Sequence, residues 1–511
     1  MKKYLLLFVI AIFVMSCSKK VEVKGKIAGS SPLERIEFVE ASGVATLPLI
    51  NIGLDKDGNF TGNFEAPKDG MYLMNYAGKS NLIFLKGGQN IQISGNSATF
   101  PNEFTLTGDG KADNEFYQAC QKYLMSYAQT LDIQAITNEK LPFFLKEIKK
   151  IESDLNKNVE ENTKKFNPSK EMIEWKKNDV KTAILNVMVG FEMVQKQMNL
   201  SNPSFKMAKE FTDYENKLLE NKEDMVQSSP FFRQYLLTKI SQDFQKYAET
   251  KTKGKTDVVT SELFNDFLKT KKDLSQTTKD YLLAFVIAQA DLRLGTNPKT
   301  ATKVSEIIEK DIKDSEIKED LKKMQFAMQG PKIGEKAPEA NLVKQDGSSF
   351  KLSENGGKPT LVVFYASWNP YVSESTLPVL KEVVNFYKSK MNFVFVNLDD
   401  TKDQFVKTSN AMFKGVTGTN VYSEGGLNSD VAKKFGIYGF KTPSFMVIDK
   451  TGKVATRAYM NLGEQELVSA LDKQTGLAAP SVAPQGMQPQ MLSPEQMKEM
   501  APPPPPPAQA K

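Results

Sequence analysis

The chain has 511 residues, 40% of them hydrophobic and 25% charged, with a formal net charge of +6. A chain of this length is too long for one hydrophobic core, so several domains are expected, and so small a net charge excludes a nucleic-acid-binding signature. Histidine is absent and only two cysteines occur, which excludes Ser-His and Cys-His nucleophilic sites and the usual His-containing metal sites, and we predict neither a metal nor a cofactor.

Residues 1–16 have the layout of a signal peptide. A basic start precedes an apolar run from Leu5 to Val14 that is too short to span a bilayer stably. Val14-Met15-Ser16-Cys17 resembles a bacterial lipobox, and this resemblance implies that Cys17 is lipidated and anchors the mature protein to a membrane. Ser18 implies, by the same resemblance, the outer membrane, and the absence of an acidic run after Cys17 favours the periplasmic face over surface display. An ordinary cleaved signal, with Cys17 incidental, is the alternative.

Residues 17–112 are predicted to form an all-β domain. Apolar and polar residues alternate in Val21–Ile27 and Asn90–Ile93, and turn signals such as Asp57-Gly58 and Gly87-Gly88 recur at short intervals. Many short strands at this spacing indicate a small sandwich or barrel. In layout, the segment resembles the β domain that precedes thioredoxin-like domains in some Gram-negative lipoproteins.

Residues 113–330 change to the helical period. One apolar stripe runs from Phe116 through Cys120 to Leu131. Further helices are expected at 141–166, 169–198, 204–221, 230–249, 258–271, 276–294 and 300–327. Cys120 is the one thiol left if Cys17 is lipidated. We favour a buried core thiol over a reactive one, because nothing in the sequence forces a cation near Cys120.

Residues 331–477 alternate strand and helix patterns, and a tail follows. Extended runs at Thr360–Tyr365, Phe393–Leu398 and Ser444–Asp449 are separated by helical patterns, which predicts an α/β layer. Residues 478–511 are rich in Pro, Gln and Met and end in a run of six prolines, so they are predicted to be disordered or polyproline II. A spacer is the first interpretation of this tail, and a ligand for a proline-binding partner is the second.

Three motifs occur in a fixed order in the α/β region. They are Gly357-Lys358-Pro359 before the first strand, Ala366-Ser367-Trp368 after it, and Thr442-Pro443 before a later strand. Over about 145 residues this pattern resembles the TlpA/ResA branch of the thioredoxin-like proteins. The resemblance implies a thioredoxin-like fold in which a cis proline at Pro443 faces the turn after Trp368.

The turn lacks the residues that give this family its chemistry. The family places a Cys-x-x-Cys pair directly after the tryptophan, where the helix start favours a thiolate that attacks disulfides. Here the matching residues are Asn369-Pro370-Tyr371-Val372. Pro378 lies one step further from the turn than is usual, and a one-residue shift would place Pro370 and Ser373 on the cysteine positions. Neither alternative supplies a thiol, and Asn369 followed by Pro370 is a well-capped helix start.

Three functions stay open from the sequence. The first is a membrane-anchored binding or scaffold protein, in which Trp368, Tyr371 and the Thr442-Pro443 loop form a groove for a protein or peptide, unless Trp368 only packs. The second is a thiol–disulfide oxidoreductase or antioxidant protein that uses Cys120 or a partner's thiols. The third is an envelope assembly or chaperone-like factor that acts through the helical region.

Overall fold

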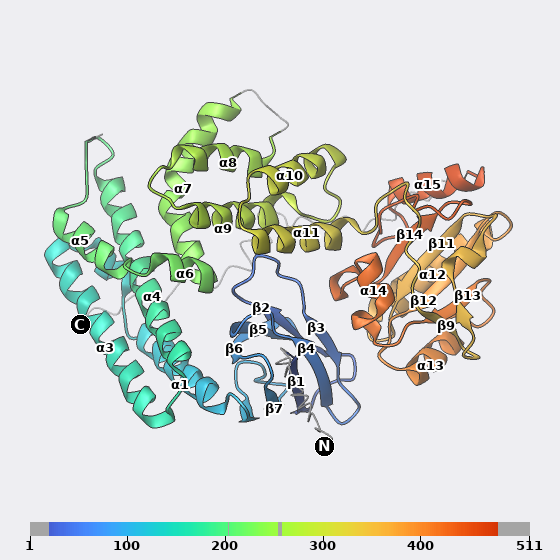
Figure 1. Cartoon of the computed structure of the whole chain (residues 1–511), viewed down its shortest axis with the longest axis horizontal. Coiled ribbons are helices and arrows are strands. Elements are labelled where there is room, and N and C mark those ends of the chain that lie inside the picture. Colours follow the sequence, from blue (N-terminus) through green and yellow to red (C-terminus); the bar gives the residue numbers. More distant parts are fainter. Residues whose placement is uncertain (1–19, 203, 254–257, 479–511) are drawn as a thin grey trace, which may run out of the picture.

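A computed structural model describes residues 20–202, 204–253 and 258–478. The predicted signal peptide, Cys17 and nearly all of the predicted tail lie outside these ranges. The described chain contains a β domain, a helical region and a C-terminal α/β domain (Figure 1), which confirms the predicted fold class. Within the described residues, no helix is both long enough and apolar enough to cross a membrane.

The β domain is a sandwich of two four-stranded sheets. Their strand orders are β4-β1-β7-β8 and β3-β2-β5-β6, and β1 pairs in parallel with β7. Alternate side chains of both sheets meet in one core that includes Val21, Phe38 and Phe60, as the alternating pattern predicts. The strands are β1 Lys20–Ala28, β2 Arg35–Glu40, β3 Ile50–Gly53, β4 Asn59–Glu65, β5 Gly70–Tyr76, β6 Lys79–Leu85, β7 Asn90–Asn96 and β8 Thr105–Gly108.

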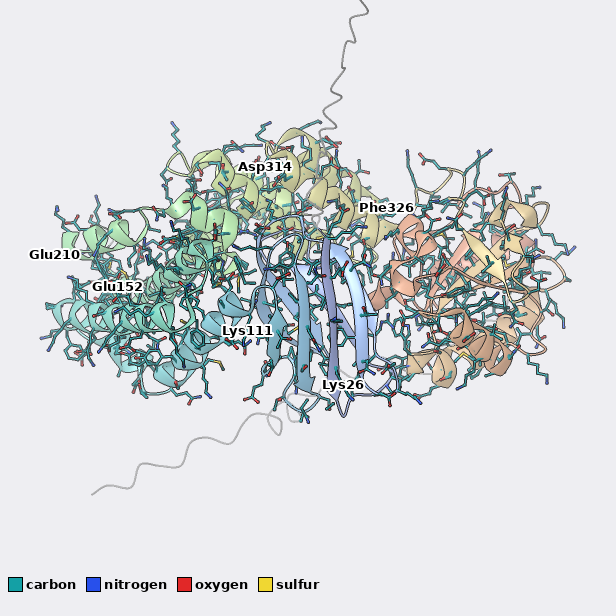
Figure 2. The ribbon with its side chains drawn as sticks, turned by 60° about the horizontal axis from the view of Figure 1, so that its bottom comes forward. Lys26, Lys111, Glu152, Glu210, Asp314 and Phe326 are labelled. Carbon is teal, nitrogen blue, oxygen red and sulfur yellow. The ribbon has the colours of Figure 1, made fainter. Side chains whose placement is uncertain are left out.

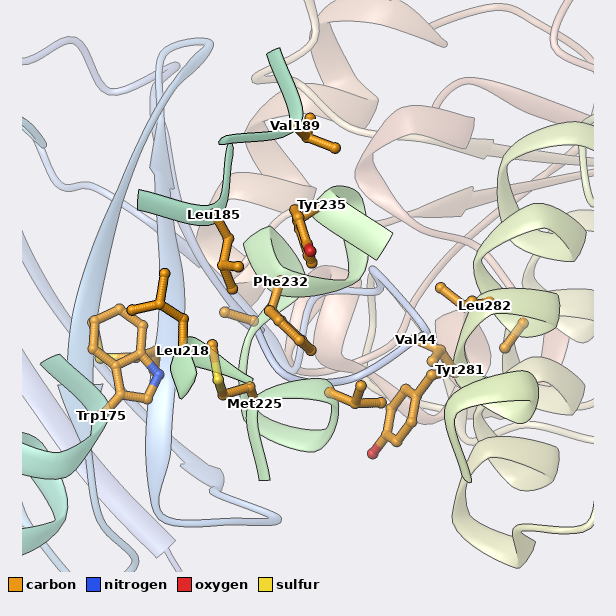
Figure 3. Packing of buried hydrophobic residues seen from close by; sticks show 14 of the residues in the cluster. Val44, Trp175, Leu185, Val189, Leu218, Met225, Phe232, Tyr235, Tyr281 and Leu282 are labelled. Atoms are coloured by element: carbon orange, nitrogen blue, oxygen red, sulfur yellow. The ribbon is translucent and has the colours of Figure 1, made fainter. Parts of the chain in front are cut away.

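The helical region packs around one large core. Its elements are α1 Lys111–Ala128, α2 Ile133–Asn138, α3 Leu141–Phe166, α4 Lys170–Met198, α5 Lys209–Leu218, α6 Lys222–Ser228, α7 Pro230–Thr252, α8 Thr260–Thr270, α9 Gln276–Val286, the π-helical η1 Ile287–Asp291, α10 Pro298–Lys310 and α11 Ser315–Gln329. Figure 3 shows part of this core, where Phe232 and Met225 lie between Trp175 and Tyr281. The apolar stripes of the helices therefore meet each other and one face of the sandwich.

Two helix predictions were wrong in detail. The predicted helix at 300–327 is two helices, because the backbone N–H groups of Lys313 and Asp314 donate to the buried Asp280 at 2.8 and 2.7 Å. Asp314 then caps α11 by accepting from Ile317 and Glu316. The helix predicted at 204–221 covers only Lys209–Leu218, and the short α2 and α6 were missed.

The C-terminal domain is built on a six-stranded sheet of order β10-β9-β13-β12-β11-β14. Strands β11, β12 and β13 are parallel, and β14 is antiparallel to β11. Its elements are β9 Leu342–Lys344, β10 Ser349–Phe350, η2 Leu352–Asn355, β11 Thr360–Tyr365, η3 Val372–Thr376, α12 Leu377–Tyr387, β12 Asn392–Asn397, α13 Lys402–Met412, β13 Thr419–Tyr422, η4 Gly426–Asn428, α14 Asp430–Phe435, η5 Gly439–Lys441, β14 Ser444–Ile448 and α15 Gln465–Thr475. Separate apolar clusters cover the two faces of this sheet.

Helix α11 leads from the helical region to the C-terminal domain. Asp314 is its N-cap, and Phe326, in its last turn, lies beside the C-terminal domain (Figure 2). Near its start, Glu316 forms a 2.5 Å ion pair with Lys68 of the β domain. The last turn of this helix therefore contacts one domain while its first turn contacts another.

Candidate functional site

The turn after β11 stands at the carboxyl end of the buried central strand. All six residues of β11 are buried, and the chain is helical again from Pro370. The backbone N–H of Ser367 donates to Asp399 at 2.6 Å, and this buried carboxylate also accepts from Asn397 and Thr408, both at 2.9 Å. The end of β12 therefore fixes the position of the turn.

Asn369 joins the turn to the proline loop. Its side-chain oxygen accepts from the backbone N–H of Tyr371 at 3.0 Å, and its side-chain nitrogen donates to the carbonyl of Thr442. The Thr442–Pro443 peptide bond is cis. The Asn369 amide thus accepts from a free N–H of the helix start and donates to a carbonyl of the proline loop. These two hydrogen bonds hold the two segments together.

The first turn of the following helix is π-helical. Element η3 covers Val372–Thr376, directly before α12, and a π turn accommodates one extra residue in a helix. This extra residue agrees with the one-step offset of Pro378 from the position that the resemblance implies. Val372 is 2% exposed and belongs to the core, whereas Tyr371 is 68% exposed. Val372 therefore faces the core, whereas its neighbour Tyr371 faces the solvent.

Trp368 is half-buried beneath an arginine of the β domain. The guanidinium of Arg35 lies 4.7 Å from the centre of the Trp368 ring, a cation–π geometry. The same guanidinium forms a bidentate pair with Asp400, both N–O distances being 2.8 Å. The Trp368 Nε1 is buried without a hydrogen-bond partner among the described residues. One aromatic residue of the predicted groove is therefore covered by the chain itself.

A second contact, close to the Arg35–Asp400 pair, joins the β domain to the C-terminal domain. Asn428 accepts from the backbone N–H of Asn51 at 3.0 Å and donates to its carbonyl at 2.7 Å, which imitates strand pairing at the edge strand β3. Gly53 lies beside the ion pair, since a Cβ there would stand 2.3 Å from an oxygen of Asp400. The β domain is thus seated directly against the turn-bearing edge.

Lys441 joins the proline loop to the ends of two helices. It is fully buried, and its ammonium donates to the carbonyls of Ala327 and Gly436, both at 2.9 Å. These carbonyls belong to the ends of α11 and α14, where a cation is favoured by the helix dipoles. Burial, reinforced by the charge of Arg457, lowers the pKa of Lys441 to about 8.

Cys120 lies in the helical region, far from this turn. It is 2% exposed, and burial raises the pKa of its thiol to about 11, against a smaller opposing effect of Lys176. Its neighbours Leu155 and Val180 come from α3 and α4, and Figure 1 places these helices at the opposite end of the molecule from the α/β domain. The structure therefore does not bring Cys120 to the turn.

The exposed side chains near the proline loop are aromatic. Phe440 is 43% exposed and stacks on Tyr438, with ring centres 5.7 Å apart and planes 7° apart. Pro443 itself is buried. Within the described chain, no group of three or more acidic or cysteine side chains is placed to hold a metal ion. The site therefore offers two exposed aromatic side chains, Tyr371 on the turn and Phe440 near the proline loop, on segments that the Asn369–Thr442 hydrogen bond joins.

Several of these residues were missed by the sequence analysis. Asp399 and Asp400 follow a buried strand directly, and paired polar residues at the carboxyl ends of parallel strands are a recognisable signal. Phe440, three residues before Pro443, could have been found as an aromatic beside the predicted loop. Arg35 carried no such signal, because it lies in another domain.

Strand order and turn together define a protein with a thioredoxin-like C-terminal domain. The Redoxin family model matches residues 332–474, and a search of curated proteins gave no match. Among solved structures, the C-terminal domain of a candidate thiol-disulfide oxidoreductase from Bacteroides thetaiotaomicron is 27% identical, covering 28% of this chain and 97% of that domain, with a TM-score of 0.25.

Two further solved structures are similar. The thioredoxin domain of a thiol-disulfide oxidoreductase from Bacteroides vulgatus is 21% identical, covering 28% of this chain and 99% of its own, with a TM-score of 0.25. A candidate thiol:disulfide interchange protein DsbE from Chlorobium tepidum is 24% identical, covering 27% and 98%, with a TM-score of 0.23. The assignment of the domain rests on the family model and the strand order rather than on these superpositions.

Proposed function

We propose that this protein is a lipid-anchored envelope protein of the TlpA-like type whose thioredoxin-like domain binds a protein or peptide segment and does not exchange disulfides. The observation that carries the proposal is the sulfur-free turn: Asn369 caps the helix and bonds the proline loop where the family has its thiolate. An amide cannot carry the two electrons of disulfide exchange.

The remaining thiol does not supply the missing chemistry. Attack on a disulfide needs an accessible thiolate, whereas Cys120 is 2% exposed with a pKa of about 11. We therefore expect the full chain to reduce insulin no faster than buffer containing the same dithiothreitol. Turnover that disappears in Cys120→Ser would refute the proposal and support an oxidoreductase.

Binding is expected on the exposed aromatic side of the turn. Tyr371 and Phe440 are 68% and 43% exposed, and exposed aromatics beside a rigid loop are common anchors for a partner. A photo-reactive phenylalanine at position 371 should cross-link a partner in the protein's own envelope, and Phe440→Ala should weaken that adduct. The matched control is the same probe at Phe143, 45% exposed on α3; equal adducts from both positions would contradict the assignment.

The anchor is proposed from the lipobox-like sequence alone, since Cys17 lies outside the described residues. The full chain should fractionate with membranes, in the outer membrane and protected from external protease. Cys17→Ser should release it. Retention of the variant on membranes would show that this cysteine is not the anchor.

A further inference from the structure

A cavity of about 320 Å³ lies where the β domain meets the helical region. Its walls are the end of β2 with the loop that follows, the β4–β5 loop, and the helices α9 and α11. This volume falls in the range of small-molecule sites, and junctions between domains are a preferred place for them. Neither the thioredoxin-like turn nor Cys120 takes part in this cavity.

One wall of the cavity is held rigidly. The loop after β2 inserts Val44 into the helical core, where it is 7% exposed. The buried Arg233 donates to the carbonyls of Ser42 and Gly43 in this loop, and also to that of Val226 at 2.6 Å. The wall is therefore formed before any ligand arrives, which reduces the entropy lost on binding.

The cavity has more carboxylates than ammonium groups. Glu40, Glu316, Glu319 and Asp320 line it, together with Lys68 and Lys323. Three of the four acids have a lysine partner: Glu316 with Lys68, Asp320 with Lys323 and Glu319 with Lys322. Glu40 accepts a hydrogen bond from Ser42 at 2.8 Å; Lys68 and Arg233 are neighbouring cations, but neither forms an ion pair with it within the described chain. Glu40 is therefore the lining carboxylate that is left to take an ion-pair partner from a ligand.

A hydroxyl in the wall borders the cavity and has no protein partner. Tyr281 as a whole is 5% exposed and lines the cavity, and no hydrogen bond joins its hydroxyl to a described residue. Figure 3 shows Tyr281 beside Val44, with the hydroxyl at the end of the ring away from Val44. The guanidinium of Arg233 lies 4.2 Å from the ring centre, so the ring face is occupied and the hydroxyl is the group left for a ligand. A hydroxyl that borders the cavity can accept a hydrogen bond from a ligand donor.

Two carboxylates converge on one open point of the cavity. A Cβ on Gly43 would stand 3.5 Å from an oxygen of Asp320 and 3.6 Å from an oxygen of Glu40. We propose that this cavity binds an alkylammonium group, with the ammonium between Glu40 and Asp320 and the methylene chain against Val44. The Tyr281 hydroxyl would accept from the same ammonium, and each bond to a carboxylate is charge-assisted. Both a free diamine and the lysine side chain of a partner carry this chemistry.

Calorimetric titration of the full chain with 1,5-diaminopentane and with N-acetyl-lysine amide tests the proposal. We expect saturable binding of at least one amine, weakened at least about tenfold by Glu40→Gln. Gly43→Ala should weaken it similarly, because its methyl occupies the open point at ordinary contact distances. Tyr281→Phe should weaken it less, and Glu65→Gln, an exposed carboxylate on β4, should have no effect.

The outcomes separate the two sources of the ligand. Binding of the diamine alone identifies a free small molecule, and binding of the lysine amide alone identifies a partner's side chain. Glutarate, an anion of similar length, should not bind. The absence of saturable binding by either amine at about 10 mM, or binding that is indifferent to both Glu40→Gln and Gly43→Ala in variants with unchanged unfolding midpoints, would overturn the proposal.

Discussion

Lys441 should make the stability of this protein depend on pH in the alkaline range. Its pKa is about 8 in the folded protein, against 10.5 for an ordinary lysine. Below about pH 8 both states hold the proton. Between about pH 8 and 10.5 the folded protein releases a proton that the unfolded chain keeps, so this group raises the free energy of unfolding as pH increases. At 1.36 kcal/mol per pKa unit, the gain from pH 7 to 9.5 is about 2 kcal/mol.

The matched variant is Lys441→Met, which keeps an unbranched side chain and removes the titration. Urea unfolding of both proteins, followed by tryptophan fluorescence at several pH values from 7 to 9.5, gives the difference in free energy. Cys120 and the buried tyrosines titrate in both proteins and cancel in that difference. We expect the wild type to gain about 2 kcal/mol over the variant across this range. A difference that stays constant with pH would show that burial does not penalise the Lys441 charge.

Four further substitutions and one labelling experiment probe the contacts around the turn and the isolated thiol. Arg35→Ala should destabilise the protein by about 2 kcal/mol and change Trp368 fluorescence, because it leaves Asp400 unpaired. Gly53→Ala should have the same effects, because its added methyl group would clash with Asp400. Unchanged Trp368 emission in both variants would refute the contact of Arg35 with Trp368 and Asp400. Asn369→Ala should cost about 1–2 kcal/mol in thermal or urea unfolding, and Asn369→Asp, which keeps the cap acceptor but not the donor to the proline loop, should fall between it and the wild type. In a Cys17→Ser background, Cys120 should react with Ellman's reagent only when the protein is unfolded, and rapid labelling of the native protein would contradict its burial.

The parts of the fold that the sequence predicted are those that depend on local pattern. The apolar run of β11, the cap formed by Asn369 and the alternation in β1 each reflect contacts within a few residues or one face of a sheet. The wrong helix at 300–327 followed an unbroken apolar period. Its break depends on Asp280, a residue more than thirty positions earlier whose carboxylate takes two backbone N–H groups.

Contacts between domains could not be predicted in this way. Arg35 and Asp400 are 365 residues apart, and an arginine at the start of a strand resembles any other exposed cation. The π turn at η3 was visible only as the offset of Pro378, which left two registers open. In the structure Asn369 bonds the Thr442 carbonyl, and which of the two registers matches the family stays a prediction.

The covered Trp368 and the supported proline loop tie the thioredoxin-like domain to its neighbours. In this chain Arg35 and Asn428 attach one side of the domain to the sandwich, and Lys441 attaches the loop to the last turn of α11. These residues therefore bind neighbouring domains on the side of the domain that carries the turn. Tyr371 and Phe440 remain exposed between these attachments. Under the proposed binding function, selection would keep the caps, the ion pair and the exposed aromatics, and it would not require a pair of cysteines at the turn.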